Sequence, residues 1–169
     1  KRSLFYIDLE ERLGYTFASE ENNLRLSLFS GFGYKHLAHK FSPTNDSSIK
    51  FKYNHIYIPL GFTSDYSFNR WFAVGLGLTW MPQVYSTVKI VPLKGARWIL
   101  TNKLANFYAE MPFTFSLTSN KRFTLQFTPT YEYWQDGHST AKTATGVRLG
   151  LPGNTYNFWG ADLNFGYSY

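Results

Sequence analysis

Apolar and polar residues alternate over long stretches of this chain. In the last stretch, residues 159–169, apolar residues such as Trp159, Leu163 and Phe165 occupy the odd positions, and Gly, Asp, Asn and Ser stand between them. Successive side chains of a β-strand point to opposite faces, so this pattern predicts strands with one apolar and one polar face. The chain is therefore expected to be all-β.

Six other stretches show the same alternation. The seven predicted strands span residues 4–17, 24–38, 53–63, 71–81, 106–117, 122–134 and 159–169, and a weaker run at 143–150 is a candidate for an eighth. Pro59 and Pro112 interrupt two of these runs and are expected to mark a bulge or the end of regular pairing. Short turns at 18–23, 64–70 and 118–121 alternate with longer connections. This arrangement predicts one antiparallel up-and-down domain, residues 1–169.

Apolar residues make up 44% of the chain, yet no stretch has the roughly 18 to 20 consecutive apolar residues of a membrane-spanning helix. A membrane-spanning form would have to be a closed sheet, because every backbone amide in hydrocarbon needs a hydrogen-bond partner. A soluble lipocalin-like barrel or sandwich is the alternative, with the apolar face turned inward. Aromatic residues near both strand ends, opposite a face of glycines and mixed charges, favour a transmembrane β-barrel of about eight strands.

In such a barrel the polar face of each strand lines the interior. Its charged residues are the acids Asp8, Glu10, Glu110, Glu132 and Asp162 and the bases Arg12, Arg25, Lys35 and Arg122. Buried charges persist only when they are paired, and a barrel of about eight strands has just enough interior space for side chains. We therefore expect a network of paired polar groups that fills the lumen, rather than an open aqueous pore.

The long connections 39–52, 82–104 and 135–155 account for the positive charge of the chain. They contain nine basic and two acidic residues, and the whole chain has a net charge of +6. Long loops face outward in barrels of this class, where Lys and Arg would bind the phosphates of a glycolipid. The expected contacts with outer-membrane lipid and lipopolysaccharide are Lys40, Lys50, Lys52, Lys89, Lys94, Arg97 and Lys103. Simple solvated loops are the alternative.

Turn lengths also predict the direction of the strands. If the short turns are periplasmic, the first predicted strand starts outside and the last ends at a periplasmic C-terminus. Seven strands that start outside do not close a barrel with an even number of strands, so we expect a further strand on the N-terminal side. The alternative uses the run at 143–150 as the eighth strand, which puts a long loop and both termini on one side.

Several segments resemble those of bacterial outer-membrane β-barrels, the porin-like or opacity-type small barrels. These segments are Asn54–Gly61, Phe72–Leu78, Thr128–Trp134 and Leu151–Thr155. The resemblance covers most of the chain, but its motifs are structural and identify no reaction. It implies an outer-membrane location and about eight to ten strands. Adhesion, envelope integrity and limited permeation are suggested for some members of this family.

Candidate catalytic residues are few. Asp136 and His138 form an Asp-x-His pair that resembles half of an omptin-type protease site, where such a pair helps to activate water. The other half, a pair of facing aspartates, has no match, and a lipid A deacylase would need a serine where Thr140 stands. Metal-ligand spacing is lacking among the other histidines, which are His36, His39 and His55. We therefore expect no enzyme activity, no catalytic residues, no metal and no cofactor.

Together these features favour a structural or surface-interaction role for an outer-membrane barrel. A small porin-like channel is the second hypothesis, and an omptin-like or lipid A-modifying enzyme is the third. The expected partners are outer-membrane lipid, lipopolysaccharide and other envelope proteins. Nucleic acid is not expected, despite a sequence pI of about 9.4, because an outer-membrane barrel does not meet it.

Overall fold

A computed structural model of the chain describes residues 2–19, 23–42, 48–91, 97–118, 122–139 and 150–167. Within these ranges the chain forms one antiparallel sheet and no helix long and apolar enough to span a membrane. The strands are β1 (Arg2–Ser19), β2 (Leu24–Phe41), β3 (Ile49–Tyr57), β4 (Leu60–Ser67), β5 (Phe72–Trp80), β6 (Gln83–Val91), β7 (Arg97–Ile99), β8 (Phe107–Glu110), β9 (Phe113–Ser116), β10 (Phe123–Asp136) and β11 (Asn154–Tyr167). The expectation of an all-β antiparallel fold is confirmed, although the described residues contain eleven strands rather than about eight.

Prolines account for most of the difference in strand number. The ladders stop at Pro59, between β3 and β4, at Pro82, between β5 and β6, and at Pro112, between β8 and β9. Proline has no N–H group to donate to a neighbouring strand, so the roles predicted for Pro59 and Pro112 are confirmed. Residues 100–106 separate β7 from β8. The eleven described strands therefore lie in seven runs between turns, namely β1, β2, β3–β4, β5–β6, β7–β9, β10 and β11.

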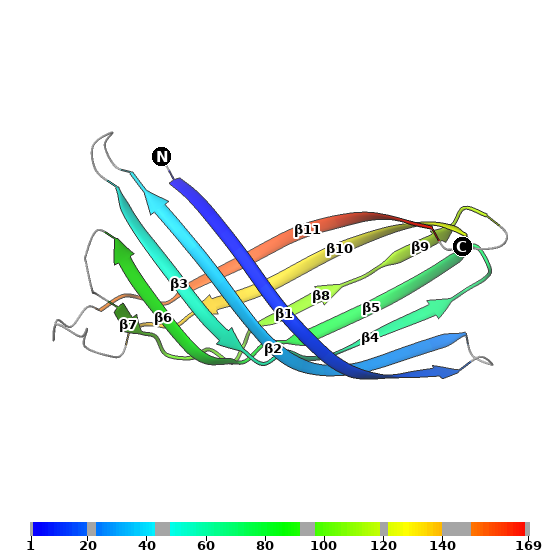
Figure 1. Ribbon diagram of the computed structural model, residues 1–169, viewed down its shortest axis with the longest axis horizontal. Helices are drawn as coiled ribbons and strands as arrows, with labels where there is room; N and C mark the ends of the chain where they lie inside the picture. Colours follow the sequence, from blue (N-terminus) through cyan, green and yellow to red (C-terminus); the bar gives the residue numbers. More distant parts are fainter. Residues whose placement is uncertain are drawn as a thin grey trace.

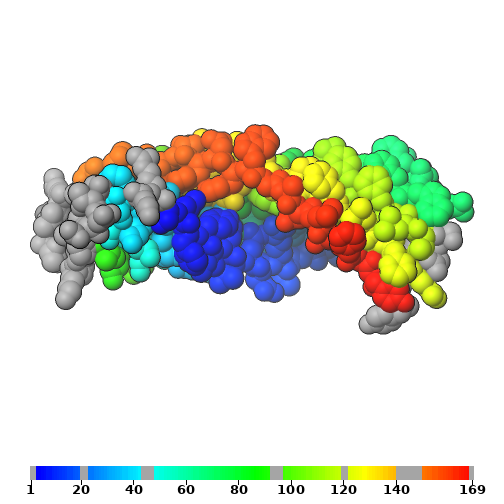
Figure 2. All heavy atoms as spheres, turned by 90° about the horizontal axis from the view of Figure 1, so that it is seen from above, coloured from blue at the N-terminus to red at the C-terminus, as the bar shows by residue number. Residues whose placement is uncertain are grey.

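Each run pairs with its neighbours in sequence, which makes the sheet a meander (Figure 1). β2 pairs with β1 along its whole length, with β4 through its first half and with β3 through its second half. The sheet ends at β1 on one side and at β11 on the other, and within the described residues no ladder joins these two edges. Viewed from above, β1 in blue and β11 in orange to red lie on the same face of the molecule (Figure 2).

The apolar face of the sheet is exposed and the polar face is buried. Large apolar residues that are at least partly open to solvent occur along the sheet, and they include Leu9, Leu13, Leu28, Phe32, Leu76, Trp80, Phe107, Phe127, Leu163 and Phe165. The buried residues include Lys35, His55, Ser86, Glu132 and Asp136. This arrangement is the reverse of the one found in a water-soluble β-protein, where burial of apolar surface drives folding.

Two expectations need correction. The connections expected at 39–52 and 82–104 contain strands, because β2 continues to Phe41, β3 begins at Ile49, and β6 and β7 were not predicted. The interior is not wholly polar, since Leu37, Tyr53, Val88, Ile90, Trp98 and Leu100 form a buried apolar cluster at the end that contains β7. Both were missed because the polarity of β6 and β7 is reversed in this region: Val88, Ile90 and Trp98 are buried, whereas Lys89 and Arg97 are exposed. The weak run at 143–150 lies outside the described residues except for Gly150.

Candidate functional site

The centre of the interior is occupied by a fully buried lysine. Lys35 extends from the inner face of β2, and its Nζ lies 3.1 Å from Asp8 Oδ2 and also contacts the Glu132 carboxylate. The same ammonium lies 4.0 Å from the centre of the Trp134 ring. Removing an ammonium group from water is expensive unless carboxylates and hydrogen bonds replace the water. Two carboxylates and an aromatic ring provide that compensation here.

Two tyrosines extend this network across the sheet. The Tyr57 hydroxyl lies 2.7 Å from Asp8 Oδ1 and 2.8 Å from Glu10 Oε2. The Tyr6 hydroxyl lies 2.9 Å from Asp8 Oδ2 and 3.1 Å from Glu132 Oε2. The side chains Tyr6, Asp8, Lys35, Tyr57 and Glu132, named here the Lys35 cluster, come from β1, β2, β3 and β10. They therefore connect distant parts of the sheet across its interior.

A second buried group lies beside the Lys35 cluster. His55 Nδ1 lies 3.0 Å from Ser86 Oγ, and His55 Nε2 lies 2.9 Å from Asp136 Oδ1. The contact with Asp136 is a close approach of the two side chains, because Nε2 makes no hydrogen bond of normal geometry. The Asp136 carboxylate also accepts hydrogen bonds from Trp134 Nε1 at 3.2 Å and from the Tyr156 hydroxyl at 2.8 Å. The carboxylate is thus held from three sides.

The order serine, histidine, aspartate is also that of a hydrolytic triad, but the environment differs. Ser86, His55 and Asp136 are all buried, and the Ser86 hydroxyl donates a hydrogen bond to Gln83 Oε1. A substrate cannot reach a nucleophile in this position. This group was not predicted from the sequence, because no carboxylate lies near His55 along the chain. The alternation of polarity does not reveal that the side chains of His55 and Asp136 meet across the interior.

The side chains of Asp136 and His138, the Asp-x-His pair, do not meet at a common site. Asp136 is buried among the interior side chains, whereas His138 is exposed and its ring lies beside the Thr101 hydroxyl, at 3.2 Å from Nε2. Across the described residues, no group of three His, Cys, Asp or Glu side chains is arranged to hold a metal ion.

The structure brings together only part of the predicted lumen network. Asp8, Glu10, Arg12, Lys35 and Glu132 meet, with Arg12 paired to Glu10. Glu110 lines a cavity of about 220 Å³ together with Asp8, Glu10, Arg12 and Glu132. Arg25 instead lies opposite Asp65 near the other end of the sheet. Arg122 is exposed just before β10, and Asp162 is exposed on the edge strand β11. These three lie apart because alternation predicts the face of a residue but not its position along the length of the sheet.

Five of the predicted glycolipid contacts form one cluster on the outer face. Lys40 lies opposite Lys50 in the β2–β3 ladder, Lys52 lies opposite Lys89 in the β3–β6 ladder, and Lys89 lies opposite Arg97 in the β6–β7 ladder. They are named here the basic patch. No acidic residue occurs in β3, β6, β7 or the second half of β2. The patch is therefore built on strands and not on loops, which corrects the expectation.

The other two predicted contacts are not part of this patch. Lys103 lies in the irregular segment between β7 and β8, where its backbone amide and carbonyl contact Gln83. Lys94 lies outside the described residues.

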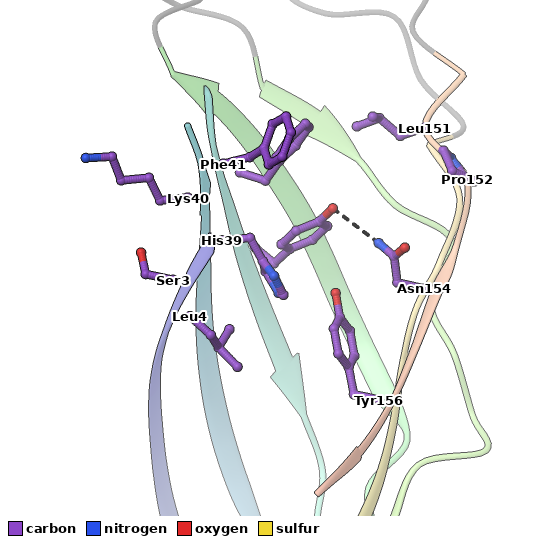
Figure 3. A pocket seen from close by; sticks show the side chains of 11 residues that line it. Ser3, Leu4, His39, Lys40, Phe41, Leu151, Pro152, Asn154 and Tyr156 are labelled. Atoms are coloured by element: carbon purple, nitrogen blue, oxygen red, sulfur yellow. Dashed lines mark hydrogen bonds between the residues drawn. The ribbon is translucent and has the colours of Figure 1, made fainter. Parts of the chain in front are cut away.

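A cavity of about 620 Å³ opens between the two edges of the sheet (Figure 3). Leu4 of β1, Phe41 of β2, Phe51 of β3 and Leu151 before β11 provide apolar surface. Polar side chains also line the cavity, among them Tyr53, whose hydroxyl accepts a hydrogen bond from Asn154 Nδ2 at 3.3 Å. The cavity is mainly apolar and lies where β1 and β11 do not pair.

Comparison of the chain with protein-family models, with curated proteins and with solved structures finds no match. A functional interpretation therefore depends on the geometry described above and on the sequence pattern.

Proposed function

We propose that this chain forms the wall of a bacterial outer-membrane β-barrel of about eight strands, with a lumen filled by side chains and a structural or surface-interaction role. The observation that carries the proposal is the reversal of the two faces, with Phe32, Leu76 and Trp80 exposed while Lys35 and Glu132 are buried. Leaving a large apolar side chain in water costs roughly 1.5–3 kcal/mol relative to burying it. Contact with acyl chains removes that cost.

The Lys35 cluster supports a closed lumen over a conducting one. Its carboxylates, ammonium and hydroxyls bond to one another across the interior, so they occupy the space through which ions would pass. A small porin-like channel is the alternative, and it requires that this cluster open. The proposal includes no catalytic role, because the nearest approach to a triad, at Ser86, is buried.

The basic patch supports the surface-interaction part of the proposal. Like charges that lie directly opposite each other on neighbouring strands destabilise a sheet unless counter-ions are bound. The patch lies at the end of the sheet with the long connections, which faces outward in barrels of this class. We infer that phosphate groups of lipopolysaccharide neutralise Lys40, Lys50, Lys52, Lys89 and Arg97 by charge-assisted hydrogen bonds.

Membrane fractionation and bilayer recording test this proposal. The protein should be recovered in the outer-membrane fraction, should require detergent for solubility, and should give no reproducible conductance steps in planar bilayers. A monodisperse protein in detergent-free buffer would refute the membrane assignment. Reproducible single-channel conductance would refute the filled lumen and favour the channel.

A further inference from the structure

The edges of the sheet, β1 and β11, run in the same direction. Each step from one run to the next is antiparallel, and an even number of such steps separates β1 from β11. Both strands accordingly run from the end with the long connections to the end with the short turns (Figure 1). The unpaired gap between them is named here the seam.

We propose that the seam is filled by one further strand, antiparallel to both β1 and β11, from polypeptide on the N-terminal side of β1. The inference rests on the proposed barrel, because only in hydrocarbon does every unpaired edge amide need a protein partner. Direct pairing of β1 with β11 would be a parallel contact in an otherwise antiparallel wall. One inserted strand makes both contacts antiparallel and gives an even number of runs, as in single-chain bacterial barrels.

Chain direction assigns this strand to the same polypeptide. Its C-terminal end would lie beside Arg2, at the end of the sheet where β2 connects to β3 and β6 connects to β7. A loop there would continue the meander. A second copy of the chain does not fit as well. With both copies inserted in the same direction, the two sheets could meet only through parallel β1–β11 contacts.

The charged residues beside the seam indicate which side chains the further strand should place on its inner face. Asp8 and Glu10 lie on the inner face of β1, and Asp162 lies on the inner face of β11. Arg12 is the only base on the described part of β1 beyond Arg2, and Asp162 has no ion-pair partner among the described residues. Since acids outnumber bases here, we expect an inward-facing Arg or Lys that pairs with Asp162.

The cavity at the seam indicates which side chains are expected near the C-terminal end of the further strand. Its walls include Leu4 of β1 and Tyr156 of β11, whose side chains lie on opposite sides of the opening in Figure 3. Apolar inward side chains near the C-terminal end of the strand would occupy part of this space of about 620 Å³. The remaining inward positions should be small or polar, because they would face Gly160 and Asn164 on β11.

Disulfide trapping tests the seam in the complete natural polypeptide, isolated in outer membranes. These 169 residues contain no cysteine, so the introduced pair supplies the only thiols within them. Ile7→Cys with Asn157→Cys places thiols on the outer faces of β1 and β11, beside Tyr6 and Phe158, whose ring centres are 5.8 Å apart. An intervening strand keeps the two Cα atoms about 9 to 10 Å apart, which is beyond disulfide reach. The expected result is no direct disulfide after oxidation.

The matched control is Leu9→Cys with Tyr34→Cys, which face each other across the β1–β2 ladder and should cross-link. An efficient Ile7–Asn157 disulfide would overturn the proposal in favour of direct closure. An intermolecular disulfide would overturn it in favour of a second copy. Either result could be obtained with the protein in the outer membrane, so the seam proposal can fail while the proposed function stands.

Charge neutralisation tests the expected inward base. Asp162→Asn should lower the ratio of folded to unfolded protein in urea by roughly tenfold, because the base would lose its partner. Glu20→Gln, which removes an acid between β1 and β2 in the sequence, is the control and should change this ratio by less than about twofold. Equal effects of the two substitutions would overturn the ion-pair assignment.

Discussion

Replacement of Lys35 is the most direct test of the filled interior. Lys35→Met keeps a long, flexible side chain but removes the ammonium group. Asp8 and Glu132 would then face each other without the charge that separates them. The Tyr6 hydroxyl, which lies within 3.1 Å of a carboxylate oxygen on each acid, cannot neutralise both. We therefore expect the variant to be markedly less stable than the parent protein.

The size of the effect follows from burial. Removing one partner of a buried ion pair typically costs about 3 to 5 kcal/mol. The lysine side chain has no exposed surface, but the side chains of Asp8 and Glu132 are 26% and 10% exposed, so water can partly compensate the abandoned carboxylates. We therefore expect the lower end of the range, about 3 kcal/mol, which corresponds to a change of roughly 150-fold in the unfolding equilibrium.

Urea titration of the protein in lipid vesicles, followed by tryptophan fluorescence, measures this difference. Lys40→Met is the matched control, because Lys40 is exposed and lies opposite Lys50, so its replacement removes a repulsion and should not lower the free energy of unfolding. Adding Glu132→Gln to Lys35→Met should restore part of the loss, since the two residues are coupled.

The reasoning would be refuted if Lys35→Met unfolded within about 0.5 kcal/mol of the parent protein. It would also be refuted if the effects of Lys35→Met and Glu132→Gln were additive. In either case the carboxylates and the ammonium would not form a coupled buried network.

Two more predictions follow from the close packing of the interior and from the basic patch. Gly33→Ala should destabilise the protein by about 1 to 3 kcal/mol in the same titration, because a Cβ at Gly33 would overlap the rigid Tyr57 ring. Gly150→Ala is the control and should be neutral, because a Cβ there would have no atom within 4 Å. Joint replacement of Lys52 and Lys89 by Gln should weaken binding to vesicles that contain phosphorylated glycolipid and reduce its salt dependence, with vesicles of neutral lipid as the control. Unchanged binding would contradict the assignment of the patch.

Much of the fold could be read from the sequence because strand alternation is a local property. Residues two apart share a face whatever the strand pairs with, so Phe32 and Lys35 could be assigned to opposite faces of β2. The interruptions at Pro59 and Pro112 were likewise predictable, since the missing N–H group is a property of proline itself. Strands β6 and β7 were not predicted, because Val88, Ile90 and Trp98 are apolar and buried where the alternation rule expects polar residues.

Partners across the interior could not be read in this way. Lys35 meets Glu132, and His55 meets Asp136, only because β2 and β3 curve towards β10, which is not their neighbour in the sheet. Alternation determines the face on which a side chain lies. The curvature and stagger of the sheet determine its position along the length of the sheet and the side chain that it meets across the interior. The basic patch has the same origin, since ladder register aligns Lys52, Lys89 and Arg97 in one row.

The sequence alone thus determined that the chain forms amphipathic antiparallel strands, because side-chain period and turn chemistry act over a few residues. Tertiary structure decided which charges are neutralised and which edges remain unpaired, because both depend on contacts between strands that are remote in the chain. Folding brings those strands together through backbone hydrogen bonds, which carry no information about side-chain identity.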